Sequence, residues 1–333
     1  MSLTGTDLFA GAGGSTTGVI QIPGVHVTIA ANHSAVACAI HNANHPTTDH
    51  AIVDLHEEDP RFFPKTDFLW ASPECTKWSK AGAARYASVS LEATLLDDDL
   101  IEDPDAAVAQ RSRLLMFDVL RFIEHHRYRL VFVENVTDIA TSKKYAYAWQ
   151  VWKRSLRKLG YKFRVISVNS MHAQAFGAPA PQSRDRLYVA AWPENEAAPD
   201  FERILRPQAY CSRCDAMVES QQAWKNGRTV GKYRDQYVYI HGACGTIVEP
   251  GYLPAYDIVD WSIPGTPIGD RLAPKTMLRV AAGVARYWGQ PFHYEHGGNQ
   301  YDAADPRHPQ HLEPNAYYRV WPIDEELRTL HTA

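Results

Sequence analysis

The chain lacks the features of membrane and secreted proteins. Its 333 residues are 45% hydrophobic, yet they contain no run of about 18 apolar residues, the length that a membrane-spanning helix needs. Residues 1–6 carry no basic segment followed by an apolar stretch, so no secretory signal is visible. The five cysteines are odd in number, which argues against a disulfide framework. We therefore expect a cytoplasmic protein with no membrane partner, long enough for one large or two ordinary domains.

The chain also lacks a strong net charge. Its 34 Lys and Arg residues against 38 Asp and Glu residues leave a formal charge of −4. Overall charge therefore does not indicate a nucleic-acid-binding protein, although a local basic face would be enough for one. Tryptophan and tyrosine are plentiful, and many lie in the second half, where they either stack on bases or fill a loop-rich core.

Short apolar segments alternate with helical ones through the first half of the chain. Strands are predicted at residues 6–10, 25–31, 51–55, 68–71, 130–133, 163–168 and 186–192, and helices at residues 34–42, 106–127 and 146–159. The acidic stretch 86–105 is predicted to be a loop. This alternation predicts an α/β fold with a doubly wound, mainly parallel sheet and right-handed crossovers.

Polar or reactive residues lie in or follow four of the predicted strands. Asp7 lies in the first strand, which leads into the glycine-rich residues 11–18, and Asn32, Cys75 and Glu134 follow three others. The carboxyl ends of parallel strands share one edge of an open sheet, where α/β proteins bind ligands. A glycine-rich turn alone is equally well a plain tight turn, and Cys75 alone reads best as a small buried hydrophobe. A thiol and a carboxylate on one edge, beside that turn, point instead to catalysis.

Five motifs, in order, resemble those of the bacterial and phage C5-cytosine-specific DNA methyltransferases. They are residues 7–14 (DLFAGAGG), 72–79 (SPECTKWS), 134–136 (ENV), 181–186 (PQSRDR) and 271–283 (RLAPKTMLRVAAG). The resemblance runs from residue 6 to about residue 288. It implies a Rossmann-like methyltransferase fold that uses S-adenosylmethionine (AdoMet), together with a smaller target-recognition domain.

The resemblance implies covalent chemistry on a cytosine flipped out of double-stranded DNA. The Cys75 thiolate would add to C6, which activates C5 toward the methyl group of AdoMet. Glu134 would hold or protonate N3, a task that requires its pKa to be raised by burial. Arg186 would contact O2, with Gln182 and Arg184 organising the site.

The same resemblance identifies the residues expected to bind AdoMet. The pocket is expected to contain Asp7, Phe9, Gly11, Gly13, Gly14 and Pro73. Asp54 would meet the adenine amino group, and Asn32 the ribose hydroxyls. Most family members carry an acid where Asn32 stands, but an amide also accepts and donates hydrogen bonds. Glu74 replaces the usual proline or aromatic residue beside the nucleophile, and its charge would tend to raise the pKa of the thiol.

Three of the five cysteines lie in one short stretch. Cys211 and Cys214 form one pair, and His241 and Cys244 a second, separated by residues 215–240. Two such knuckles suit a tetrahedral Zn²⁺ held by three thiolates and one imidazole. The alternative is three unligated thiols and a chance histidine.

The predicted metal element lies between the fourth and fifth motifs, the interval in which the family reads DNA. Strands at residues 237–240 and 246–249 are expected to form the hairpin of a zinc ribbon, and a structural role is expected for the metal. His172 and His26 remain alternatives to His241 as the fourth ligand. The connecting stretch carries basic residues that suit phosphate contacts or form a solvated loop. These residues are Lys225, Arg228, Lys232 and Arg234.

The expected domains follow from the motif order. They are an AdoMet-binding catalytic domain at residues 1–193, a target-recognition domain at residues 194–268 with the zinc ribbon-like element at about 210–250, and a C-terminal segment at residues 269–333 that returns to the catalytic domain. A helix is predicted at residues 277–288. The closing motif of the family is not recognised in the last segment.

Two alternative functions therefore stay open beside DNA methylation. One is a catalytically inactive, zinc-containing DNA-binding protein, and the other is a tRNA cytosine-C5 methyltransferase. For the preferred function we expect a monomer, with a cognate restriction enzyme as a candidate partner.

Overall fold

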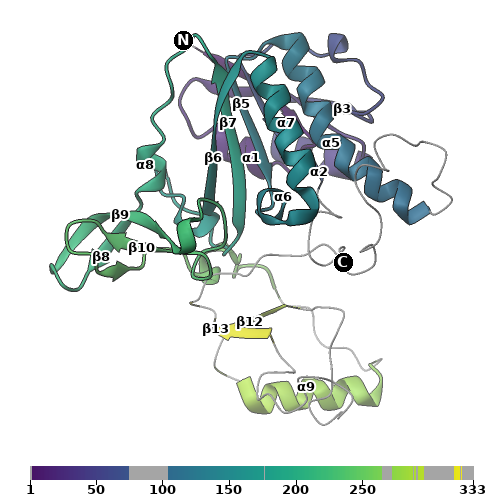
Figure 1. Ribbon diagram of the computed structural model, residues 1–333. Coiled ribbons are helices and arrows are strands. Elements are labelled where there is room, and N and C mark those ends of the chain that lie inside the picture. Colours follow the sequence, from purple (N-terminus) through teal and green to yellow (C-terminus); the bar gives the residue numbers. More distant parts are fainter. Residues whose placement is uncertain are drawn as a thin grey trace. The chain divides into compact units, whose positions relative to one another are not determined.

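The structure is a computed structural model, shown in Figure 1. It describes residues 2–74, 104–175, 177–264, 272–287, 289, 292–295, 319–322 and 324. The chain divides into two compact units, one made of residues 1–168, 175–177 and 185–249, the other of residues 169–174, 178–184 and 250–333. Cys75 and most of the predicted acidic loop lie outside the described residues.

A seven-stranded sheet forms the centre of the first unit, in the order β3-β2-β1-β4-β5-β7-β6 (Figure 1). The strands are β1 (Leu3–Leu8), β2 (Val25–Asn32), β3 (Asp49–Ile52), β4 (Phe68–Ala71), β5 (Leu130–Asn135), β6 (Tyr161–Asn169) and β7 (Asp185–Pro193). The first five strands pair in parallel, and β7 runs antiparallel to β5. The prediction of a mainly parallel sheet is confirmed.

Two strands, β1 and β3, differ from the sequence prediction by three residues at one end, whereas the others agree to within two residues. β1 begins at Leu3, before the predicted residue 6, because residues 3–5 pair with residues 25–27 of β2. It ends at Leu8 because Phe9 adopts a left-handed φ of 59°, which a strand does not accommodate. β3 ends at Ile52, before the predicted residue 55, because the chain turns at Asp54, whose carbonyl accepts from the N–H groups of residues 57 and 58.

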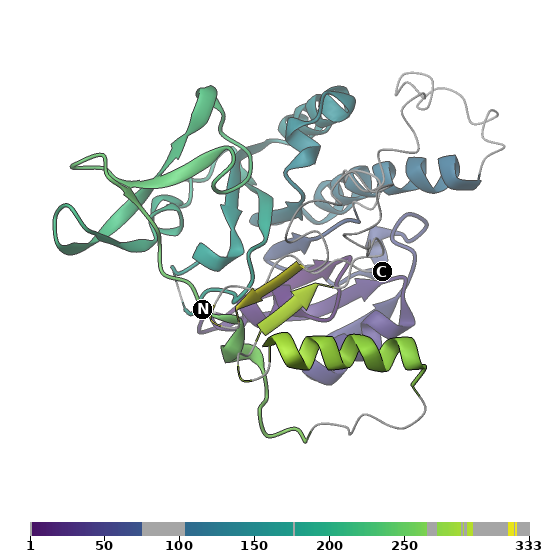
Figure 2. The ribbon, with the colours of Figure 1, turned by 90° about the horizontal axis from the view of Figure 1, so that it is seen from below.

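Helices cover both faces of the sheet, as Figure 2 shows for α1 and α2 on one face and α5 and α7 on the other. The helices of the first unit are α1 (Gly14–Val19), α2 (Ala35–Asn44), η1 (Pro60–Phe62), α5 (Pro104–His126), α6 (Asp138–Thr141), η3 (Lys143–Tyr145), α7 (Ala146–Lys158), α8 (Glu202–Leu205) and η5 (Lys225–Gly227). The predicted helices at residues 34–42, 106–127 and 146–159 correspond to α2, α5 and α7.

The core lies between the sheet and the α5–α7 pair. α7 buries Trp149, Trp152 and Leu156, whose spacing of three and four residues sets them on one helix face. The Trp152 indole N–H donates to the Met116 carbonyl of α5 at 2.7 Å, so its one polar atom is satisfied. Burial of each large apolar side chain contributes about 1.5–3 kcal/mol, which makes this layer the rigid support of the sheet.

A second, four-stranded antiparallel sheet also belongs to the first unit, in the order β11-β10-β9-β8. Its strands are β8 (Gln208–Cys211), β9 (Ala216–Trp224), β10 (Tyr237–His241) and β11 (Ile247–Val248). The predicted hairpin at residues 237–249 is confirmed as β10 and β11, whereas β8 and β9 were not predicted. Ser167 of β6 holds this sheet, because its hydroxyl donates to the Gly231 carbonyl at 2.8 Å and its carbonyl accepts from Gln222.

The second unit contains one long helix and a two-stranded sheet. These are α9 (Pro274–Tyr287) and the antiparallel pair β12 (Phe292–Glu295) and β13 (Arg319–Pro322), with η4 (Ser170–His172) and η6 (Ala255–Ile258). α9 begins three residues before the predicted helix because Pro274 suits a first helical turn. Among the described residues, no helix combines the length and apolarity needed to cross a bilayer.

Candidate active site and metal cluster

The carboxyl ends of five parallel strands meet at one edge of the main sheet. Leu8 pairs with Ala31 of β2 and with Ala71 of β4, and Ala71 pairs with Val133 of β5. The prediction that these strand ends share an edge is confirmed. Because β7 is antiparallel to β5, it starts at this same edge and brings Arg186 there. The glycine-rich loop, the chain leading to Cys75, and Glu134 all follow or end strands at this edge.

The glycine-rich loop presents open backbone. A Cβ atom added at Gly11 or at Gly14 would meet no atom within 4 Å. Gly13 has a φ of 100°, which a residue with a side chain rarely adopts. Phe9, with its φ of 59°, turns the chain out of β1 into the loop, and such strained backbone in bulky residues gathers at ligand sites. The loop therefore offers the close approach that a nucleotide-like cofactor requires.

Asp7 supports this loop from beneath. Its side chain is fully buried, and its Oδ2 accepts from the hydroxyls of Ser15 at 2.6 Å and Thr16 at 3.1 Å. Its Oδ1 is buried without a hydrogen-bond partner among the described residues. Burial raises the pKa of Asp7 to about 6, against the opposing effect of the two hydroxyls. A buried, incompletely bonded carboxylate under an open loop fits a site that is completed by a ligand.

Asn32 ends β2 and links two neighbouring segments. Its Nδ2 donates to the Ala10 carbonyl at 2.8 Å, and its Oδ1 accepts from the Ser34 N–H at 2.7 Å. An amide has two protons and two lone pairs, so these bonds leave capacity for a further contact. The ribose contact expected for Asn32 stays a prediction.

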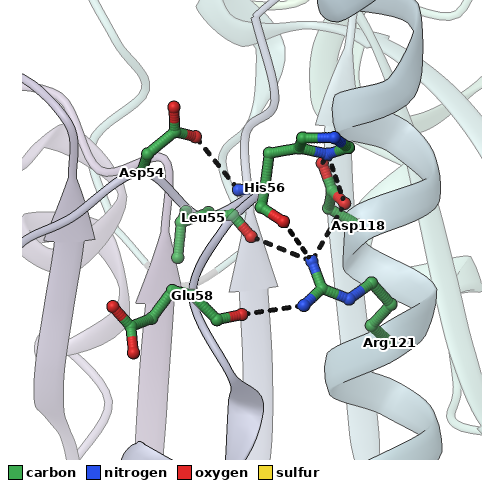
Figure 3. Close-up of polar contacts among 6 residues, drawn as sticks. All are labelled: Asp54, Leu55, His56, Glu58, Asp118 and Arg121. Carbon is green, nitrogen blue, oxygen red and sulfur yellow. Dashed lines mark hydrogen bonds and ion pairs between the residues drawn. The ribbon is translucent and has the colours of Figure 1, made fainter.

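Asp54 lies in the loop after β3, and a cluster on α5 fixes that loop (Figure 3). Arg121 donates to the carbonyls of Leu55 at 3.3 Å, His56 at 2.7 Å and Glu58 at 2.8 Å. Three carbonyl contacts from one guanidinium fix the path of the backbone. The adenine contact expected for Asp54 would come from this fixed loop.

Asp118 completes the cluster on α5. It is almost fully buried, and its carboxylate oxygens lie 3.1 Å from His56 Nδ1 and 3.3 Å from Arg121. Figure 3 shows the Asp54 carboxylate accepting from the backbone N–H of His56 at 3.1 Å. Sequence analysis missed Asp118 and Arg121, because polar positions on a long amphipathic helix carry no sign of what they contact. It missed His56 because a single histidine in a loop carries no such sign either.

Asn135 links the ends of β4 and β5. Its Nδ2 lies 3.5 Å from the Pro73 carbonyl, and its Oδ1 accepts from the Val136 N–H at 2.8 Å. The side chain is buried. Pro73 is thereby held next to the end of β5, two residues before Cys75, which lies outside the described residues. The AdoMet contact expected for Pro73 stays a prediction.

Glu134 and Arg186 form an ion pair across β5 and β7. Arg186 Nε lies 2.7 Å from Glu134 Oε1, and the two side chains are only 13% and 17% exposed. Arg186 also donates to the Asp185 carbonyl at 2.8 Å. Two predicted site residues that are 52 positions apart in the chain are thus in direct contact. A guanidinium beside a carboxylate can hold a polar ring through both a donor and an acceptor.

Gln182 and Arg184 fall in the second compact unit. There, the Arg184 N–H donates to Asn169 Oδ1 at 2.9 Å, and the Arg184 carbonyl accepts from the Ser170 N–H at 3.0 Å. The Ser170 hydroxyl donates to the Gln182 carbonyl at 3.2 Å. These bonds fix the backbone of the segment that leads into β7.

The four predicted metal ligands come together in the small sheet. Cys211 ends β8, Cys214 lies in the turn to β9, and His241 and Cys244 lie at the β10–β11 turn. Their ligand atoms all lie within 4.8 Å of one another. The Cys211 and Cys244 sulfurs are 3.6 Å apart, and a tetrahedral Zn²⁺ with bonds of about 2.3 Å requires sulfurs about 3.8 Å apart. The donor set and its spacing therefore fit Zn²⁺.

His241, rather than His172 or His26, completes the cluster. Its Nδ1 lies 3.2 Å from the Cys244 sulfur and 3.4 Å from the Cys214 sulfur. Hydrogen bonding with Thr246 lowers the pKa of the Cys244 thiol to about 6, whereas hydrogen bonding with Cys244 raises the pKa of the Cys214 thiol to about 11. Of the two, Cys244 is therefore the thiol that readily forms the thiolate that a metal binds. The cluster sits beside a small apolar core centred on Tyr237 and Tyr239, too few residues to stabilise four strands alone.

The fold and its site define a class of protein. A mostly parallel seven-stranded sheet, with β7 antiparallel and a glycine-rich loop after its first central strand, is the AdoMet-dependent methyltransferase fold. Within this class, the chain belongs to the C-5 cytosine-specific DNA methylase family, whose family model matches residues 3–236.

Two curated relatives are type II methyltransferases. The chain is 24% identical to M.SsoII of Shigella sonnei over 186 residues and 25% identical to M.BsuFI of Bacillus subtilis over 202 residues. These segments cover 56% and 60% of this chain but only 41% and 42% of the relatives. The chain thus spans less than half the length of the curated relatives it matches. A solved Spodoptera frugiperda DNMT2 variant superimposes with a TM-score of 0.46 at 15% identity, over 84% of this chain and 65% of that one.

Proposed function

We propose that this protein is a DNA (cytosine-5-)-methyltransferase that transfers a methyl group from AdoMet to C5 of a flipped cytosine. The contact between Glu134 and Arg186 carries the proposal. This contact joins an acid and a guanidinium at one edge of the main sheet. Residues 72–74, which lead to Cys75, follow β4 at the same edge. The family membership and the two type II methyltransferases support DNA as the substrate.

The proposed roles follow from the charge that develops on the ring. Addition of the Cys75 thiolate to C6 breaks the C5–C6 double bond and moves its electrons toward N3 and O2. Glu134 delivers a proton to N3, and Arg186 donates hydrogen bonds to O2. Gln182 and Arg184 are proposed to position the ring. Once C5 carries the methyl group, a base removes the C5 proton and N3 returns its proton to Glu134. The C5–C6 double bond then forms again, and the Cys75 thiolate leaves C6.

AdoMet, when bound, supplies the electrophilic methyl group. Gly11, Gly13 and Gly14 would let the cofactor approach the loop backbone, and Phe9 would pack against it. Asn32 and Asp54 would bind its ribose and adenine, with Pro73 closing the pocket on the side of β4. The open space at Gly11 and Gly14 and the incompletely bonded Asp7 support this assignment.

We propose that Cys211, Cys214, His241 and Cys244 hold one structural Zn²⁺. The metal would fix both hairpins of the small sheet, and residues 194–268 would serve as the target-recognition domain. The backbone N–H of Tyr233 donates to Asp185 Oδ1 at 2.9 Å. This bond supports a firm link between the zinc module and Arg186, the next residue along β7.

The test is methyl transfer itself. The purified chain is incubated with labelled AdoMet and mixed-sequence duplex DNA, and 5-methylcytosine is mapped by sequencing. We expect methylation in one short sequence context, and no transfer by Cys75→Ser with DNA binding retained. Cofactor binding without methylation of DNA in any context would refute the proposal.

A parallel reaction with tRNA separates the remaining alternatives. Transfer to tRNA but not to DNA would identify the RNA enzyme, and failure to bind AdoMet would favour the inactive DNA-binding protein. On the proposed function, the chain works on DNA as a monomer. Because the relatives are type II methyltransferases, the partner we expect is a restriction enzyme of the same specificity.

A further inference from the structure

Three histidines gather behind the glycine-rich loop. His41 lies in α2, His45 caps its C-terminus, and His50 lies in β3. The His41 ring centroid is 5.0 Å from that of His45 and 4.9 Å from that of His50. His41 and His45 are almost fully buried. Neither the sequence motifs nor the proposed chemistry gives these residues a role.

His45 contacts the loop directly. Its Nε2 lies 3.0 Å from the Gly13 carbonyl oxygen and 3.0 Å from the Thr17 hydroxyl. A carbonyl oxygen only accepts, so His45 Nε2 carries the proton in this contact. A Cβ added at Gly13 would lie 2.5 Å from His45 Cδ2. The imidazole therefore packs against Gly13 and also bonds to it, at the turn where α1 begins.

His41 reaches the same loop through Thr16. The Thr16 hydroxyl donates to Asp7, so it accepts from His41 Nε2, which lies 3.1 Å away. His41 Nδ1 is then an acceptor, and it accepts from His50 Nε2 at 2.8 Å. The Asp7 carboxylate can only accept, so it sets the direction of each hydrogen bond in the series from His50 through His41 and Thr16 to Asp7.

Burial and the neighbouring imidazoles keep His41 neutral at ordinary pH. Burial, with His50 and His45 adding to it, lowers the pKa of His41 to about 4. Burial also lowers the pKa of His50, opposed by a hydrogen bond with the Thr48 backbone and by the nearby Asp49. The groups that face His41 are thus His45, His50 and, through Thr16, Asp7. Near pH ~7 the imidazole of His41 is uncharged and donates through Nε2.

We propose that His45 and His41 are positioning residues that hold residues 13–17 in the conformation that binds AdoMet. The proposal rests on the proposed function, because it assigns the cofactor to this loop. His45 acts through the Gly13 carbonyl, and His41 acts through the Thr16 hydroxyl. Neither contacts a reacting atom, so their effect falls on cofactor binding and not on the chemical step.

The test measures binding of AdoMet to the full chain by calorimetry for wild type, His45→Leu and His45→Gln. Leucine fills the space without a donor, and we expect it to weaken binding about tenfold, the effect of losing one hydrogen bond in a buried site. Glutamine keeps an Nε2 donor and is expected to bind within about threefold of wild type. His41→Leu is expected to weaken binding in the same direction. His125→Leu, at an exposed position of α5, is the matched control.

Steady-state kinetics and hydrogen exchange complete the test. His45→Leu should raise KM for AdoMet while kcat at saturation stays near that of wild type. In the cofactor-free protein, the Thr17 amide, which donates to the Gly13 carbonyl at 2.8 Å, should exchange faster in His45→Leu than in His45→Gln.

Four results would decide against the positioning role or the proposed function. Equal binding by wild type and His45→Leu, or equally weak binding by the Leu and Gln variants, would overturn the positioning role. Unchanged Thr17 exchange would overturn it as well. If wild type bound no AdoMet, the proposed function would fail, while the exchange comparison would still decide whether His45 holds the loop.

Discussion

Glu134→Gln tests the acid at the edge of the sheet with little disturbance to its surroundings. Glu134 accepts from Arg186 Nε at 2.7 Å in a pair that is only 13% and 17% exposed. A glutamine carbonyl oxygen accepts the same hydrogen bond, so the contact survives while the charge and the transferable proton disappear. Glu134→Ala removes the contact as well and serves as the comparison.

The two variants should separate catalysis from stability. Loss of a general acid costs about 10²–10⁴-fold in rate, which is a barrier increase of about 3–5 kcal/mol at 1.36 kcal/mol per tenfold. Glu134→Gln is expected to show this full loss in rate, with a change in unfolding free energy below about 1 kcal/mol. Glu134→Ala leaves Arg186 largely buried without its partner. It is expected to lose a further ~1–3 kcal/mol of stability, less than for a fully buried pair.

The assay is single-turnover methyl transfer to duplex DNA, with urea unfolding and AdoMet binding measured on the same preparations. AdoMet binding should be equal in wild type and Glu134→Gln, because the proposed roles assign this pair to the cytosine ring and the glycine-rich loop to the cofactor. A Glu134→Gln rate within about threefold of wild type would refute the role given to Glu134. Arg186→Lys keeps the charge but lacks the planar fork, and should fall between wild type and Glu134→Gln.

Three further predictions concern the metal site, the buried carboxylate of Asp7, and Arg121, which binds the loop after β3. Elemental analysis should find one zinc per chain. Cys214→Ser should lose the metal and destabilise the small sheet, because a structural Zn²⁺ contributes about 10–16 kcal/mol of binding free energy. Cys38→Ala is the control. Asp7→Asn should gain stability relative to wild type by about 1.4 kcal/mol between about pH 5 and about pH 7.5 in urea unfolding. Arg121→Ala should speed amide exchange at residues 56–58 and lower stability by about 1–3 kcal/mol.

The sign of the Asp7 prediction follows from its pKa, which burial raises from 3.8 to about 6. A raised folded-state pKa contributes stability that is fully present below the unfolded value and is lost as the pH rises through about 6. If the difference in unfolding free energy between wild type and Asp7→Asn did not change across this pH range, the raised pKa of Asp7 would be wrong. A chain without zinc, or unchanged exchange in Arg121→Ala, would contradict the other two predictions.

The strands of the main sheet were predictable because their patterns are local. Residues 68–71 and 130–133 are continuous apolar runs, as expected of strands buried on both faces, and the structure has them in adjacent parallel β4 and β5. The antiparallel direction of β7 was not predictable, because a hydrophobic run has no direction. That direction brings Arg186 to Glu134. The motif resemblance assigned both residues to one site, but the ion pair between them was not predicted.

The small sheet shows the opposite case. β9 contains Glu219, Ser220, Gln221 and Gln222 in succession, a polar run that hides its strand from any hydrophobic pattern. The ligand spacing nevertheless predicted the cluster, because two short Cys or His pairs in turns are a local signal. Contacts such as Arg121 with Glu58 join positions 63 residues apart, and His45 contacts the Gly13 carbonyl, 32 positions earlier in the chain, only after folding. Neither leaves a mark in the local sequence.

Covalent trapping of Cys75 tests the central claim most directly. The chain is incubated with AdoMet and duplex DNA that carries 5-fluorocytosine at the methylated position. After addition to C6 and methyl transfer, C5 carries fluorine and methyl and no proton, so elimination cannot release the thiol. We predict a stable adduct whose mass equals protein, DNA and one methyl group, with peptide mapping placing the bond at Cys75. Methylation of ordinary DNA without any adduct on the fluorinated strand, or an adduct at another residue, would contradict the account.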